Sequence, residues 1–168
     1  MSRYYNSKGI PWSKLGREIK KLWDSNLKLE IHCTSMPLRG KTAIGSTTFP
    51  RYCITLNKEI IFDYPGQFLD SVCCKAQWWQ KRYADENGNI KIRDSYPYEC
   101  HTVSEISVLI REYIDREKDR LFEPFGNDRW NLIPILRAAD KRIGKRRLEK
   151  IETDNEGAKK IISLRLNT

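Results

Sequence analysis

Apolar residues recur at changing periods along this chain, and each change of period marks a predicted element. Residues 12–23 place apolar side chains at every third or fourth position, which predicts an amphipathic helix with Ser13 as a candidate N-cap. Residues 27–33 alternate apolar and polar side chains, which predicts a half-buried strand. Residues 36–47 are rich in Pro, Gly, Ser and Thr and predict a loop, while residues 1–11 predict an N-terminal arm.

Two β-branched and aromatic runs lie within residues 51–63, on either side of Asn57 and Lys58. This pattern predicts a β-hairpin or a bulged pair of strands, and Pro65 with Gly66 should end it. The alternate positions of the first run, which share one face of the predicted strand, are Tyr52, Ile54 and Leu56.

Helical spacing returns over residues 68–83, and it is followed by a predicted turn at 85–89 and a short predicted strand at 90–93. A further helix is predicted over residues 103–118. Thr102 opens it and forms a capping box with Glu105. Its outer face alternates in charge, as a solvated helix face does, and Arg111 belongs to that face.

The last predicted helix covers residues 134–148. Proline is tolerated at the first position of a helix and destabilises its interior, so we place the start at Pro134. Gly144 either caps this helix or lies within it at a cost of about 1 kcal/mol. Residues 152–159 predict a polar linker, and the alternation over residues 160–166 predicts a last strand.

This order of elements has no repeating strand–helix–strand rhythm. It therefore favours an α+β fold, with a small, mainly antiparallel sheet and about four helices packed on it. A length of 168 residues fits one domain, and an aromatic content of 11% supplies large apolar side chains for its core.

Composition bears on the compartment that we expect. No apolar run approaches the roughly 20 residues of a membrane span, and the first residues carry no apolar stretch typical of a signal peptide. The five cysteines are odd in number, which favours reduced thiols over a disulfide framework. We therefore expect a cytoplasmic protein without membrane contact.

Several stretches are similar to a known family. These stretches read W-S-K-L from Trp12, R-Y-x-I-T-L from Arg51, D-Y-P from Asp63, and I-L-R-A-A-D-x-R-I-G-K-R-R-L from Ile135. They resemble a family of short, uncharacterised bacterial proteins. The resemblance covers most of the chain apart from residues 68–95, which look like an insertion. It implies no cofactor, activity or site residue, because none is assigned to that family.

The strongest candidate for function is the basic segment 137–150. It holds seven basic and two acidic residues, so it carries +5 of the chain's formal net charge of +9. An exposed run of Lys and Arg can bind nucleic-acid phosphates, and arginine can also reach guanine edges. We therefore expect a non-catalytic protein that binds DNA or RNA. The predicted contact residues are Arg137, Lys141, Arg142, Lys145, Arg146 and Arg147, with Arg39 and Lys41 from the loop.

Three alternatives stay open. Trp78 and Trp79 are adjacent, so one ring should point away from the core and could bind a protein partner, as an adaptor or regulator would. A nuclease could hold a metal ion through Glu59 and Asp63, beside Lys58. A weak zinc alternative would draw on Cys73, Cys74, Cys100 and His101, which lack a C-x₂-C pair.

Overall fold

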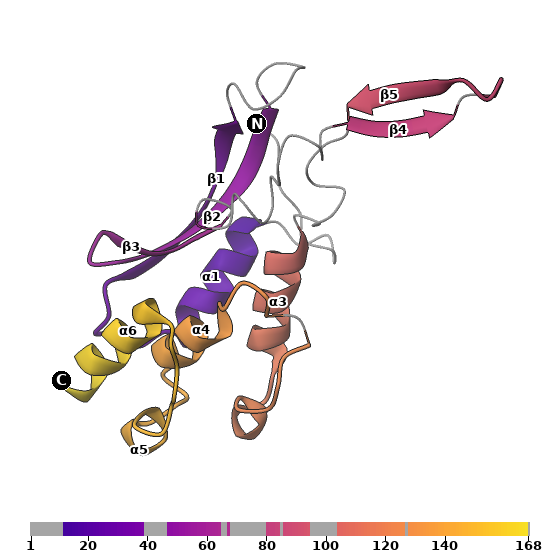
Figure 1. Cartoon of the computed structure of the whole chain (residues 1–168). Helices are drawn as coiled ribbons and strands as arrows, with labels where there is room; N and C mark the ends of the chain where they lie inside the picture. Colours follow the sequence, from indigo (N-terminus) through magenta and orange to yellow (C-terminus); the bar gives the residue numbers. More distant parts are fainter. Residues whose placement is uncertain are drawn as a thin grey trace.

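The structure is a computed structural model of the chain, shown in Figure 1, and it describes residues 12–38, 47–64, 67, 80–84, 86–94, 104–126 and 128–167. A three-stranded antiparallel sheet, a two-stranded ribbon and five α-helices make up the described part. The α+β class expected from the sequence is therefore confirmed. The strands are β1 (Leu29–Leu38), β2 (Thr47–Leu56), β3 (Glu59–Tyr64), β4 (Gln80–Ala84) and β5 (Ile90–Asp94). The helices are α1 (Trp12–Leu22), α3 (Ser104–Asp115), α4 (Ile133–Ala139), α5 (Lys145–Leu148) and α6 (Glu156–Leu166), with a 3₁₀ turn at Lys118–Arg120.

The main sheet has the order β1-β2-β3, with β2 at its centre. Asn57 (φ 52°) and Lys58 (φ 72°) both adopt left-handed backbone conformations between β2 and β3, as the two central residues of a type I′ hairpin turn do. The register shifts between Ile54 and Thr55, which is the bulge that the sequence allowed. The hairpin prediction is confirmed, and the first strand runs on to Leu38, beyond its predicted end.

One face of this sheet packs on the helices. Tyr52, Ile54 and Leu56 on β2 are buried, as their alternation predicted. In Figure 1, α1 and α3 lie side by side on this face, and α4 and α6 adjoin them. Gly157 of α6 lies against Ile61, where an added Cβ would come within 3.0 Å of that residue's backbone oxygen. The close approach of α6 to β3 therefore depends on a residue without a side chain.

Two predicted elements differ from the structure. The predicted last strand over residues 160–166 is wrong, because Glu156–Leu166 form α6, which begins within the predicted linker. Asn155 caps this helix by accepting a hydrogen bond from Ala158 N (3.0 Å), and Ile161 with Arg165 supplies a helical buried stripe. The predicted helix 68–83 is wrong at its end, where residues 80–83 belong to β4 and pair with β5. Residues 68–79 lie outside the described part. The predicted turn at 86–89 and the strand that follows it are confirmed.

The basic segment is not one helix. The chain leaves the helical conformation at Asp140, the C-cap of α4, and starts a new four-residue helix after Gly144. Gly144 is thus the N-cap of α5 and neither of the alternatives that the sequence left open. Pro134 does lie at the start of α4, as predicted. Ser13 lies inside α1, so it is not the N-cap of this helix as predicted. The capping box predicted at Thr102 is not tested, because Thr102 lies outside the described residues.

Candidate nucleic-acid interface

The break at Asp140 sorts the basic residues into an inner and an outer set. Arg142 belongs to the inner set, because its side chain is bound on every side. Its Nε donates to both carboxylate oxygens of Asp140 (3.1 and 2.9 Å), and its Nη1 donates to the carbonyl of Arg116 (2.9 Å). Burial opposes its charge, but the hydrogen bonds and the charge of Asp140 outweigh burial and raise the pKa of Arg142. This predicted phosphate ligand is therefore a structural residue.

Asp140 is the centre of this inner cluster. It is fully buried, and its carboxylate also accepts a hydrogen bond from the Tyr113 hydroxyl (2.9 Å) and one from the backbone N–H of Arg142 (2.8 Å). Burial, followed by the neighbouring carboxylate charge, raises the pKa of Tyr113 well above its usual value. These donors fulfil the hydrogen-bonding capacity of the buried carboxylate. Because Tyr113 belongs to α3 and Asp140 is the C-cap of α4, the cluster holds α3 against the end of α4.

Arg137 is also turned inward. Its Nε donates to the carbonyl of Leu121 (2.8 Å) and its Nη2 to the carbonyl of Glu123 (3.0 Å). Burial lowers the pKa of its guanidinium. A guanidinium that caps the carbonyls of the connector after α3 is not available for a polyanion. The prediction that Arg137 and Arg142 bind phosphate therefore has no support in their surroundings.

Sequence reasoning missed a third inner arginine, Arg165 of α6. Its guanidinium donates to the carbonyl of Ala138 (2.7 Å) in the last turn of α4 and to that of Ile143 (2.8 Å) in the turn before α5, and its Nε donates to Asp24 (3.1 Å). The carbonyl of Ala138 is one of those that the last turn of a helix leaves unbonded. The alternation of residues 160–166 concealed this role, because it placed Arg165 on the exposed side of a strand.

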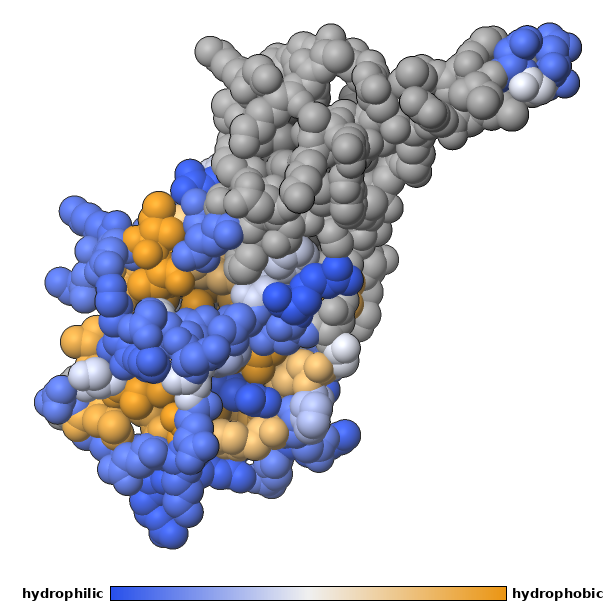
Figure 2. All heavy atoms as spheres, in the orientation of Figure 1, coloured by the Kyte–Doolittle hydropathy of each residue, from blue (hydrophilic) through white to orange (hydrophobic). Residues whose placement is uncertain are grey.

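The outer set consists of the remaining basic residues of the segment, and all of them are exposed. Lys145, Arg146 and Lys150 form no ion pair with other residues of the described ranges. Arg147 approaches Asp119 (3.9 Å) and lies over the ring of Phe122 (5.5 Å to the centroid). Figure 2 shows a strongly hydrophilic surface where α5 protrudes at the lower end of the molecule. The exposed members of the segment are Lys141, Lys145, Arg146, Arg147 and Lys150.

Tertiary packing adds two exposed lysines from the last turn of α1, Lys20 and Lys21. The backbone N–H of Lys141 donates to the carbonyl of Leu22 (2.8 Å), and that of Asp24 donates to the carbonyl of Ala139 (2.8 Å). These two bonds join the end of α1 to the end of α4. As a result Lys20, Lys21 and Lys141 line one surface hollow of about 540 Å³.

The charge balance of this hollow is positive. Its one acidic lining residue, Asp24, is paired with Arg165, whereas Lys20, Lys21 and Lys141 have no ion pair within the described part of the chain. We call these three residues with Lys145 and Arg146 the outer lysine surface. Three exposed ammonium groups line one hollow, and Lys145 and Arg146 follow Lys141 by four and five residues along the chain. Such a set of cations can follow a row of phosphates.

The paired carboxylates of the nuclease alternative do not converge. Asp63 forms two hydrogen bonds with Arg51 (2.6 and 2.7 Å), and Glu59 pairs with Lys160 of α6 (2.5 Å). Each carboxylate thus has its own cation, and the register of β3 with β2 shifts between the positions of Glu59 and Asp63. No group of three or more potential metal ligands occurs among the described residues.

Other candidates of the sequence lie outside the described residues. They are Arg39 and Lys41 of the loop, the adjacent Trp78 and Trp79, and Cys73, Cys74, Cys100 and His101 of the zinc alternative. Cys33 and Cys53 are described and are free thiols, as expected. None of the described helices is long and apolar enough to cross a membrane.

Comparison with known proteins gives one match. The model of the SF0329 protein family matches residues 11–166. The chain belongs to this family. No curated protein and no solved structure matches the chain. Family membership confirms the resemblance to an uncharacterised family and does not bear on a bacterial origin. It adds no site residue to those that the geometry indicates.

Proposed function

We propose that this protein binds nucleic acid without catalysing a reaction, through the outer lysine surface. The observation that carries the proposal is the hollow at the joint of α1 and α4, where Lys20, Lys21 and Lys141 meet although about 120 residues of chain separate them. Their charges repel one another, so this arrangement does not stabilise the fold. A polyanion would relieve the repulsion.

The physical basis is electrostatic. Each ammonium group that neutralises a phosphate releases condensed counterions, so affinity falls as salt concentration rises. Lysine is a flexible point charge without fixed hydrogen-bond geometry, in contrast to the planar fork of arginine. Arg137 and Arg142 use their guanidinium groups in hydrogen bonds within the protein, so Arg146 is the one arginine of the outer lysine surface that could reach a base edge, beside four lysines. Binding should therefore depend on the phosphate backbone and only weakly on sequence.

The test measures the binding of a labelled oligonucleotide by fluorescence polarisation at about 50 and 200 mM salt. The triple variant Lys20→Glu, Lys21→Glu, Lys141→Glu should bind at least about tenfold more weakly at the lower salt concentration and show a shallower salt dependence. The control reverses three exposed cations elsewhere, namely Lys14, Arg17 and Lys118. It makes the same change in net charge and should retain most of the affinity.

Two outcomes contradict the proposal. Equal losses in the triple variant and the control would show attraction by net charge alone. Absence of binding by the unmodified protein at the lower salt concentration would exclude the function itself. The unfolding midpoint of both variants should match that of the unmodified protein, because all the substituted side chains are exposed.

A further inference from the structure

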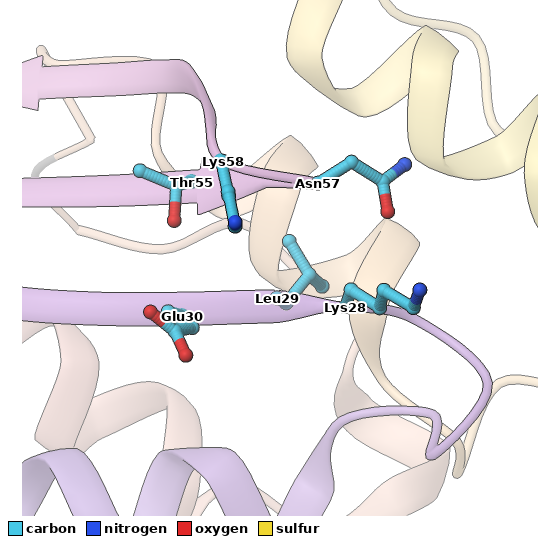
Figure 3. A pocket seen from close by; sticks show the side chains of 6 residues that line it. All are labelled: Lys28, Leu29, Glu30, Thr55, Asn57 and Lys58. Atoms are coloured by element: carbon cyan, nitrogen blue, oxygen red, sulfur yellow. The ribbon is translucent and has the colours of Figure 1, made fainter.

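A second hollow adjoins the first one at the end of the main sheet. It has a volume of about 460 Å³, and Leu29 lines both hollows. Figure 3 shows its side chains at the ends of β1 and β2, where Lys58 extends toward β1. The residues that line it are Lys28, Leu29, Glu30, Thr55, Asn57 and Lys58.

The charge balance of the second hollow repeats that of the first. Lys28 and Lys58 are exposed and have no ion pair among the described residues, whereas the only acidic lining residue, Glu30, lies 3.2 Å from the His32 imidazole. A third hollow adjoins at Asn57, and there the lysines are neutralised. Lys159 pairs with Glu156 (2.7 Å) and Lys160 with Glu59 (2.5 Å). The row of unpaired lysines thus runs over two hollows and ends at the third.

The backbone at Lys58 supplies an independent observation. Its φ of 72° lies in the left-handed region, and a type I′ turn favours glycine at this second central position. Lysine here is less stable than glycine, yet its side chain points over the hollow (Figure 3). Strained residues of this kind concentrate at binding sites, because function maintains them against the conformational cost.

The shape of the surface indicates which nucleic acid it would bind. A duplex presents stacked bases inside two rigid backbones, and proteins usually reach it with protruding elements that enter a groove. Here the cations surround depressions that contain apolar and hydrogen-bonding groups, among them Leu29, Thr55 and Asn57. A volume of about 460 Å³ falls within the roughly 300–1,000 Å³ of small-ligand pockets. An unstacked base could enter such a depression while the lysines hold the adjacent phosphates.

We infer that the two adjoining hollows bind single-stranded nucleic acid, with Lys28 and Lys58 holding phosphates next to a base that lies over Leu29, Thr55 and Asn57. This inference rests on the proposed function, and it adds the strandedness of the ligand and two binding residues. Neither lysine lies in the basic segment 137–150.

The experiment compares a single-stranded oligonucleotide of about 12 nucleotides with a hairpin duplex of the same base composition. The unmodified protein should bind the single strand about tenfold more tightly. The double variant Lys28→Glu, Lys58→Glu should bind the single strand about tenfold more weakly, and its salt slope should fall by about 0.7 for each phosphate that the protein no longer neutralises.

The single variant Lys58→Gly separates binding from folding. Glycine suits the left-handed turn, so the melting temperature should rise, while affinity for the single strand should fall several-fold. A matched control is Lys118→Gly, which removes an exposed lysine away from both hollows.

The outcomes distinguish the two proposals. If the duplex binds as tightly as the single strand, or if the Lys28 and Lys58 variants bind normally while the Lys20, Lys21 and Lys141 variant does not, the inference is wrong and the proposed function stands. If neither oligonucleotide binds, both are wrong.

Discussion

Arg142 and Arg146 are four residues apart in the same basic run, yet they occupy opposite environments. The guanidinium of Arg142 is bound by Asp140, by the carbonyl of Tyr113 in the last turn of α3 and by the carbonyl of Arg116 directly after that helix. Arg146 is exposed and has no ion pair in the described ranges. The inner cluster around Asp140 holds helices together, whereas the outer lysine surface contributes charge without structural contacts. A run of positive charge in a sequence is therefore not one feature, and the largest consequences of this difference should appear in stability.

Substitution of Asp140 should have the largest effect. In the Asp140→Ala variant, Arg142 loses its carboxylate and the buried Tyr113 hydroxyl loses its acceptor. Removal of one partner from a buried ion pair typically costs about 3–5 kcal/mol, and the partial exposure of Arg142 places the expected loss near the lower figure. Urea denaturation gives the free energy of unfolding. The control is Asp119→Ala, an exposed carboxylate, with an expected change of less than about 0.5 kcal/mol.

Alkaline pH should destabilise the fold by a smaller amount than the Asp140→Ala substitution. Burial raises the pKa of the Cys33 thiol to about 12, and burial with the charge of Asp140 raises that of Tyr113 further. In the unfolded chain these groups ionise near pH 8.5 and 10. A raised pKa stabilises the fold fully below the unfolded value, and this stability is lost as pH rises toward the folded value. The full shifts would lower the free energy of unfolding by about 3 kcal/mol between pH ~8 and ~10.5. Because Cys33 is only partly buried, we expect a loss of about 2 kcal/mol in urea denaturation.

Two variants test which side chains cause the loss of stability at alkaline pH. Tyr113→Phe removes one titrating group and Cys33→Ala another, so each should reduce the loss of stability at high pH, while the raised pKa values of Tyr52 and Cys53 leave part of that loss in both variants. A pH dependence that stays the same in both variants would show that neither group is the cause.

The smallest effect on stability is expected at the outer lysine surface. In the double variant Lys145→Ala, Arg146→Ala, neither substitution removes an ion pair with a described residue. The free energy of unfolding should change by less than about 0.5 kcal/mol, and alanine is well tolerated in a helix. A loss of more than about 2 kcal/mol would show that α5 is fixed through these side chains, and it would remove the distinction between the inner and outer sets.

Much of the fold could be predicted from the local spacing of apolar and polar residues. The hairpin around Asn57 and the buried stripe of α3 follow from periodicity, because side chains two apart on a strand or three to four apart on a helix share a face. The spacing gave a wrong prediction where the same residues fit both the two-residue period of a strand and the 3.6-residue period of a helix. In α6, Ile162, Leu164 and Leu166 alternate like a strand, yet Leu164 is exposed and Ile161 is buried.

The sequence by itself determined the α+β class, the amount of positive charge and its concentration in segment 137–150. Tertiary structure alone decided which of those charges are available. Solvation explains this difference. A buried guanidinium must find carbonyls or carboxylates from distant segments, as Arg137 and Arg142 do, and such partners are invisible in a linear pattern. Lysines that find none stay at the surface, and the packing of α1 on α4 brings Lys20 and Lys21 to Lys141.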